Sequence, residues 1–132
     1  MHTCPFCALI AKQLPADSIY EDENTLVILP KEIESYGHTL IIPKQHYLSF
    51  FDIPKTELHH LMDTTQVITL LYQEKLGTSG INLLHASGED AGQSVQHFHF
   101  HLFPRFSDDN IDLWPKFPNY KADREHFLNT IK

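Results

Sequence analysis

Histidine alternates with large apolar residues over the short stretch 97–103, whose sequence is His-Phe-His-Phe-His-Leu-Phe. Successive side chains of a β-strand point to opposite faces, so this order predicts a strand with histidines on one face and apolar residues on the other. The histidines are His97, His99 and His101, and the apolar residues facing away from them are Phe98, Phe100 and Leu102. Three neighbouring imidazoles titrate near neutral pH and repel one another when charged, which disfavours a half-buried strand with incidental histidines. We therefore expect a core on one face and a chemical site on the other.

The chain has 132 residues, enough for one domain with a substantial core and too few for two. Hydrophobic residues make up 42% and charged residues 20%, which is typical of a soluble globular protein. No apolar run approaches the ~20 residues that span a membrane, and no signal peptide is recognisable, so we expect a cytoplasmic protein. The net charge of −7 argues against general nucleic-acid binding, and an anionic substrate would need local, directed donors.

The only two cysteines, Cys4 and Cys7, form a Cys-x-x-Cys pair. An intracellular chain disfavours a disulfide, and a redox motif would be expected beside a βαβ pattern, which the sequence lacks. Two thiolates at this spacing supply half of a tetrahedral zinc site, which needs two further nitrogen or sulfur ligands. From the cysteines alone, a zinc site and a metal-free pair both stay open.

Hydrophobic periodicity and turn residues predict the remaining elements. Short β-rich runs predict strands over 18–21, 25–29, 39–43 and 81–85, and helical spacing predicts helices over 6–14, 52–76 and 122–131. The order predicts an α+β fold: an antiparallel sheet of about five strands, one long helix packed on it, and short terminal helices. After the histidine strand the chain is irregular. Trp114 could contact a ligand or a partner there, but packing against the domain is the stronger expectation.

Two segments resemble the histidine-triad (HIT) family of nucleotide-binding proteins. Residues 97–103 match its signature His-φ-His-φ-His-φ-φ, in which φ is apolar, and residues 37–46 resemble an earlier family motif. Two motifs in the right order are far more specific than either alone. The resemblance spans 4–105, so we expect a single HIT domain over 1–132 with a C-terminal extension at 106–132. It also implies a homodimer.

The resemblance implies a mechanism. His99 would attack the α-phosphorus of a purine nucleotide conjugate, a phosphoramidate or a dinucleoside polyphosphate, and water would then release the nucleotide from the nucleotidyl-histidine. The Nδ1 of His99 would donate to a backbone carbonyl, leaving Nε2 free. His101 would stabilise charge on the phosphate oxygens, and His38 would support the triad. Attack by imidazole requires no Mg²⁺, and no motif for one is present.

Further site residues also follow from the resemblance. The phosphate would meet Gly92, Gln93 and Ser94, whereas Phe6, Leu9 and Ile28 would line a slot for the nucleobase or simply belong to the core. In the zinc-bearing branch of the family, the two cysteines are joined by a histidine after the Ile-Pro-Lys segment and by the first triad histidine. These correspond to His46 and His97. If His97 binds structural Zn²⁺, proton transfer falls to His101.

Two positions depart from the family pattern. Pro30 stands where relatives carry an Asp that binds the ribose, so either Glu32 or Glu34 substitutes or the sugar is held loosely. Ala86 stands where relatives carry Asn or Gln, so one substrate contact is missing unless Ser87 replaces it. These departures motivate two alternatives: a nucleotide-binding regulatory module with little catalysis, and a structural domain held together by zinc.

Overall fold

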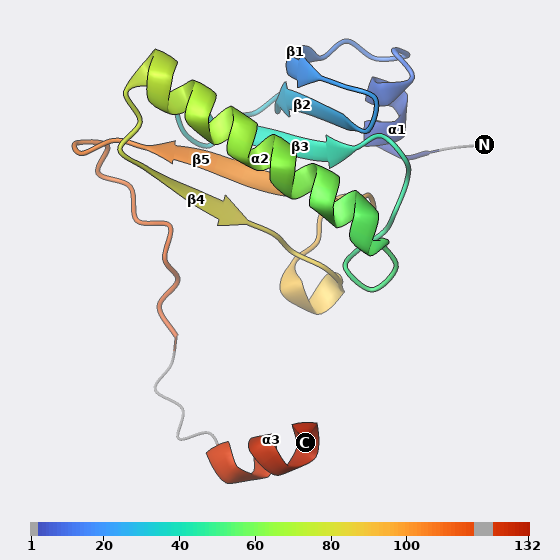
Figure 1. Cartoon of the computed structure of the whole chain (residues 1–132), viewed down its shortest axis with the longest axis vertical. Helices are drawn as coiled ribbons and strands as arrows, with labels where there is room; N and C mark the ends of the chain where they lie inside the picture. The colour runs from blue at the N-terminus through green and yellow to red at the C-terminus, as the bar shows by residue number, and fades with distance from the viewer. Residues whose placement is uncertain (1–2, 118–122) are drawn as a thin grey trace.

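The computed structural model describes residues 3–117 and 123–132. In chain order the elements are α1 (Pro5–Ile10), β1 (Asp17–Glu21), β2 (Thr25–Leu29), β3 (Thr39–Pro43), α2 (Lys55–Leu76), β4 (Gly80–Leu84), a 3-10 turn (Glu89–Ala91), β5 (Phe100–Arg105) and α3 (Arg124–Ile131). The strands form one five-stranded antiparallel sheet in the order β1-β2-β3-β5-β4, and α2 crosses one face of it (Figure 1). The predicted α+β architecture is confirmed. None of the described helices is long and apolar enough to cross a membrane.

Apolar side chains fill both faces of the sheet. The cluster shared with α2 contains Val27, Ile41, Ile53, Leu61, Ile68, Tyr72, Phe98, Phe100 and Leu102. The cluster on the other face joins α1 to β2 and β3 and contains Phe6, Leu26, Ile28, Leu40 and Ile42. The residues predicted to face the core, Phe98, Phe100 and Leu102, therefore all lie in the α2 cluster. This leaves the histidines on the α1 face.

The strand that carries the histidines begins later than the alternation predicts. Strand β5 starts at Phe100 rather than His97. Its neighbour β3 ends at Pro43, which has no N–H with which to continue the ladder. Phe98 instead donates its N–H to the carbonyl of Tyr47, at 2.7 Å. Two of the three histidines thus lie on an irregular segment held by bonds outside the sheet.

Two helices are shorter than predicted. Helix α2 begins at Lys55, because the Asp52 carboxylate closes the preceding turn and accepts the N–H of Ser49 at 2.8 Å. Helix α1 ends at Ile10 instead of continuing over 6–14, and Lys12 beyond it has a positive φ of 62°. Both ends are set by turn geometry that hydrophobic periodicity does not report.

The described part of the C-terminal extension, residues 106–117 and 123–132, adds no residue to either buried cluster. The Arg105 guanidinium binds the Asp109 carboxylate at 2.9 Å and closes the loop after β5. Trp114 is 75% exposed, so the prediction that it packs against the domain is wrong. Helix α3 begins at Arg124 and has no buried residue. The predicted start of this helix, at 122, lies outside the described residues.

Replacing Gly37 with Ala is expected to destabilise the fold. Gly37 has a φ of +80°, and a Cβ there would lie 2.6 Å from Cγ of Pro104. We expect a loss of about 2 kcal/mol or more from strain and overlap together. Gly77→Ala is the matched control: its φ is +70° with nothing within 4 Å, so it should lose only about 1 kcal/mol. Urea denaturation measures the free energy of unfolding of both variants. Equal losses of stability would contradict a steric overlap at Gly37.

Candidate functional site

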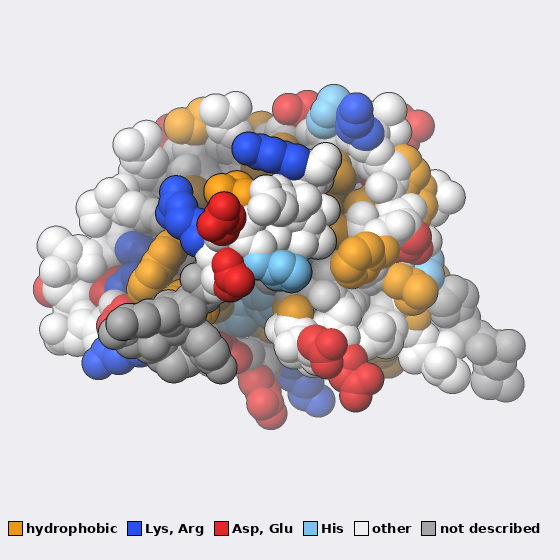
Figure 2. Space-filling model, turned by 90° about the horizontal axis from the view of Figure 1, so that it is seen from below, with side chains coloured by type: hydrophobic (Ala, Val, Ile, Leu, Met, Phe, Trp, Pro, Cys, Tyr) orange, Lys and Arg blue, Asp and Glu red, His pale blue; other side chains and the backbone are white. Residues whose placement is uncertain are grey.

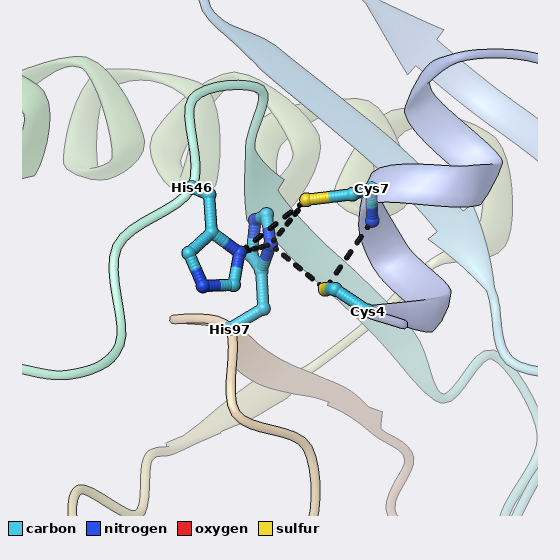
Figure 3. A group of neighbouring side chains, drawn as sticks. All are labelled: Cys4, Cys7, His46 and His97. Carbon is cyan, nitrogen blue, oxygen red and sulfur yellow. Dashed lines mark hydrogen bonds between the residues drawn. The ribbon is translucent and has the colours of Figure 1, made fainter. Parts of the chain in front are cut away.

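Four sulfur and nitrogen donors converge where α1 meets the sheet (Figure 3). Cys4 is the N-cap of α1 and Cys7 lies within its first turns. His46 follows β3, and His97 precedes β5. Their ligand atoms all lie within 4.8 Å of one another, and the group could hold a metal ion. The structure therefore brings together the four residues predicted as metal ligands, from three separate parts of the chain.

Three sulfur-to-nitrogen separations in this cluster, of 3.3, 3.4 and 3.6 Å, are close to those expected around a tetrahedral ion. The Nδ1 of His97 lies 3.4 Å from Sγ of Cys4 and 3.0 Å from Nδ1 of His46, and the His46 Nδ1 lies 3.3 Å from Sγ of Cys7. Tetrahedral bonds of about 2.0–2.3 Å place ligand atoms roughly 3.3–3.8 Å apart. The carbonyl of Pro43 can only accept, so the His97 Nε2 donates to it at 2.9 Å, which turns the Nδ1 lone pair toward the sulfurs.

The Cys7 thiol disfavours ionisation when no cation is present. Burial, followed by the hydrogen bond and charge of Cys4, raises the pKa of Cys7 to about 11. A bound cation would reverse this effect, because metals bind thiolates and release their protons. Two sulfur and two nitrogen donors suit a metal cation, which would also stabilise the thiolate form of the cysteines.

His99 lies beside this cluster with its tautomer fixed. Its Nδ1 donates to the carbonyl of His97 at 2.8 Å, which is the predicted contact, so Nε2 carries the lone pair in the neutral ring. Burial is the main cause that lowers the pKa of His99. The ring meets Phe6 edge to face, with centroids 5.1 Å apart. His99 is thus neutral at neutral pH, with one nitrogen available for attack.

His38 and His101 form a directed pair on the same face. The N–H of Glu34 donates to Nδ1 of His38 at 3.4 Å, so the proton of neutral His38 sits on Nε2. That Nε2 lies 2.9 Å from Nδ1 of His101, and His101 in turn carries its own proton on Nε2. Phe103 stacks on His38, with centroids 4.3 Å apart. His101 therefore offers an N–H donor near His99, whose ring centroid is 4.9 Å away.

The loop before the triad is built around Gln93. Its buried side-chain amide donates to the carbonyls of Leu48 (2.6 Å) and Val95 (3.0 Å) and accepts the N–H of Gly88 (2.8 Å). Gly92 is exposed and has a φ of +84°, which favours glycine. Gln93 therefore shapes the predicted phosphate loop, and its amide is not presented to a ligand.

Ser94 and the residues predicted to line a nucleobase slot occupy different places. Ser94 is exposed and lines a pocket of about 340 Å³ together with Cys4 and His46. Leu9 and Ile28 line a larger, mostly apolar cleft of about 520 Å³. Phe6 is buried beneath the histidines and is absent from the residues lining that cleft. Histidine side chains lie in a hollow of the face seen from below, with acidic side chains at its rim (Figure 2).

A model of the HIT domain matches residues 11–108. The chain belongs to the HIT domain family. An uncharacterized HIT-like protein of Methanocaldococcus jannaschii is 40% identical over 130 residues, 98% of each chain. The adenylylsulfatase HINT3 of Arabidopsis thaliana is 35% identical over 129 residues, 98% of this chain and 62% of that one. The crystal structure of a Zn-bound histidine triad family protein from Mycobacterium smegmatis is similar with a TM-score of 0.80 at 32% identity, covering 98% of each chain.

This HIT domain departs from the family pattern where the ribose is expected. Lys31, next to Pro30, lines the apolar cleft, whereas Glu32 and Glu34 are exposed and are absent from its lining residues. The structure therefore gives no support to either glutamate as a substitute for the missing Asp. The cleft does carry a cationic side chain, that of Lys31.

Sequence reasoning missed one histidine of this HIT domain. His85 follows β4, and its Nδ1 lies 2.9 Å from the carbonyl of His99. Its Nε2 contacts the hydroxyl of Ser87, which also accepts the N–H of Phe50 at 2.9 Å. The signal was a histidine at the end of the strand predicted to pair with the histidine strand. The sequence suggested Ser87 as a replacement substrate contact. Its hydroxyl hydrogen is instead donated to His85, so it is not free to bind a substrate.

Stability of the HIT domain is expected to fall as the pH drops from 6.5 toward 4. Burial, followed by the charges of His99, His38 and His85, lowers the pKa of His101 from 6.5 to about 4. Within that window the unfolded chain binds a proton that the folded chain does not, so unfolding is favoured by up to about 1.4 kcal/mol per pH unit. His101→Asn should show a shallower slope in urea denaturation across the window. Identical slopes would contradict a neutral, half-buried His101.

Proposed function

We propose that this HIT protein is a nucleotide-binding hydrolase or transferase that cleaves the α-phosphate bond of purine nucleotide conjugates through a nucleotidyl-His99 intermediate. The observation that carries the proposal is the state of His99. Its Nδ1 proton is committed to the His97 carbonyl and burial keeps the ring neutral. A neutral imidazole with a free Nε2 is a nucleophile toward phosphorus, and few purely structural roles would need that arrangement.

The reaction has two displacements at the same phosphorus. The Nε2 of His99 forms a bond to the α-phosphorus while the bond to the leaving amine, sulfate or phosphate breaks, and the leaving group takes up a proton from solvent or a site donor. The N–H on Nε2 of His101 donates to a non-bridging oxygen and stabilises its charge. Water then attacks the phosphorus, the bond between phosphorus and Nε2 breaks, a proton of the water passes to solvent, and neutral His99 is regenerated. For transfer, another acceptor takes the place of water.

The proposal includes a structural Zn²⁺ held by Cys4, Cys7, His46 and His97. The separations and donor types support it, and so does the similarity to the Zn-bound protein of Mycobacterium smegmatis. The ion would join α1 to the β3 loop and to the segment before β5. The His97 side chain would then bind the metal, while its backbone carbonyl accepts the hydrogen bond from Nδ1 of His99. Proton donation therefore falls to His101. No step requires Mg²⁺.

We also propose that the protein is a homodimer. Apolar side chains of the C-terminal extension stand in solvent: Trp114, Phe127 and Ile131 are 75%, 62% and 71% exposed. The family resemblance implies a homodimer, and exposed apolar side chains of this kind would suit contact with a second copy. Sedimentation equilibrium should give twice the chain mass. A monomer at micromolar concentration would contradict the proposal.

A substrate panel tests the proposed activity. Adenosine 5′-phosphoramidate, adenosine 5′-phosphosulfate and a diadenosine polyphosphate differ only in the leaving group. The phosphosulfate is included because the Arabidopsis relative is named an adenylylsulfatase. We expect AMP release from at least one of them, with guanosine analogues as the base comparison. AMP binding without hydrolysis of any conjugate would favour the regulatory module, which the losses at Pro30 and Ala86 motivate.

A further inference from the structure

We propose that His85, with Ser87, is a positioning residue for His99. A directed chain of hydrogen bonds runs from the Phe50 N–H through the Ser87 hydroxyl and the His85 ring to the His99 carbonyl. This chain holds the peptide from which the His99 imidazole extends. The proposal deepens the proposed function and rests on it in one respect, namely that His99 is the attacking residue.

The direction of the chain follows from the donor types. The N–H of Phe50 can only donate, so Ser87 accepts it at 2.9 Å. The carbonyl of His99 can only accept, so Nδ1 of His85 donates to it at 2.9 Å. The neutral His85 ring then has an acceptor at Nε2, and the Ser87 hydroxyl donates its hydrogen there. Burial, which is the main influence on the His85 pKa, lowers it and keeps the ring in this neutral form.

His85 acts from the face opposite the catalytic histidines. Its ring packs against Phe98, Phe100 and Phe50, with centroid distances of 4.4, 5.6 and 4.7 Å. Phe98 and Phe100 belong to the cluster under α2. His85 therefore reaches His99 through its main chain and leaves the imidazole of His99 on the other side. A substrate at the triad would not touch it.

The irregular segment before β5 explains why such a residue is needed. The ladder between β4 and β5 reaches Leu84 and His101 and stops there. The His99 carbonyl lies beyond that point, and the His85 ring supplies the donor that a strand N–H would otherwise supply. Without it, an exposed or unpaired carbonyl would let the peptide rotate, and the Nδ1 contact of His99 with the neighbouring His97 carbonyl would loosen.

Three variants separate positioning from structure. His85→Leu removes the donor, His85→Asn keeps an N–H at the same distance along the side chain, and Ser87→Ala frees the tautomer of His85. We expect His85→Leu to lower kcat about tenfold with KM within about twofold, since small displacements of a reacting group are costly. His85→Asn should recover kcat to within about threefold of wild type, and Ser87→Ala should fall between the two. His59→Leu, on the exposed side of α2, is the matched control and should change nothing.

The imidazole ¹⁵N shifts of His99 provide a readout that does not depend on turnover. Wild type and His85→Asn should show one neutral tautomer, with the proton on Nδ1, and His85→Leu a mixture. Wild-type kcat and a single tautomer in His85→Leu would overturn the proposal. If that variant does not fold, unchanged kcat and tautomer in Ser87→Ala would overturn it. If wild type hydrolyses no conjugate while the tautomer responds as expected, positioning by His85 stands and the proposed function fails.

Discussion

Replacing His99 with Asn is expected to lower kcat by about 10³-fold or more, while the protein stays folded. The Asn amide can still donate to the His97 carbonyl, which His99 contacts at 2.8 Å, so the segment before β5 keeps its hydrogen bond. It has no nitrogen lone pair that can attack phosphorus. Steady-state kinetics on the best substrate of the panel give kcat and KM, and thermal denaturation checks the fold.

The matched control for this substitution is His60→Asn. His60 is exposed on α2, away from the triad, and the change should leave kcat and KM within about twofold of wild type. His101→Asn should be intermediate, losing about 10²-fold, because it removes one charge-stabilising donor and leaves the nucleophile. If His99→Asn kept kcat within about tenfold of wild type, covalent catalysis at this residue would be ruled out.

Removing the metal is expected to have the largest effect on stability. A ligand that binds the folded chain at about 1,000 times its dissociation constant stabilises it by about 4 kcal/mol. Loss of this stabilisation by the bound metal should lower the Tm by more than about 10 °C in a chain of this size. Elemental analysis of the purified protein should find one zinc per chain. Thermal denaturation with and without a chelator then measures the stabilisation.

Cys7→Ser tests whether the cluster of Cys4, Cys7, His46 and His97 is the site. Its Tm should match that of chelator-treated wild type, and the chelator should have no further effect. Ser94→Ala is a suitable comparison, since Ser94 lines the adjoining pocket but supplies no ligand. Its Tm should drop with chelator as in wild type. Zinc-free wild type with an unchanged Tm in chelator would contradict a structural metal.

The sequence predicted the parts of the site that depend on local order. The alternation of 97–103 predicted which side chains enter the core, and Phe98, Phe100 and Leu102 do so. The family motifs predicted that Cys4, Cys7, His46 and His97 would meet, and their ligand atoms do. Each of these inferences uses either a strand period or a motif whose spacing already encodes the contact.

What the sequence did not predict depends on contacts between distant backbone groups. Pro43 ends the β3 ladder and makes the His97 segment irregular, which the alternation alone cannot reveal. The Gln93 amide turns inward because three backbone groups converge on it. His85 gains its place only once β4 and β5 are paired. A single sequence can place His85 at the end of a strand, but it does not show which backbone groups these side chains will bind.

Intact-mass spectrometry after a brief acid quench tests the central claim most directly. Wild type mixed with its fastest substrate from the panel should carry a transient adduct with the mass of one AMP group, and peptide mapping should place it on His99. His99→Asn should carry none. An adduct that maps to another residue, or an adduct of the same mass that His99→Asn still forms, would contradict the nucleotidyl-His99 mechanism.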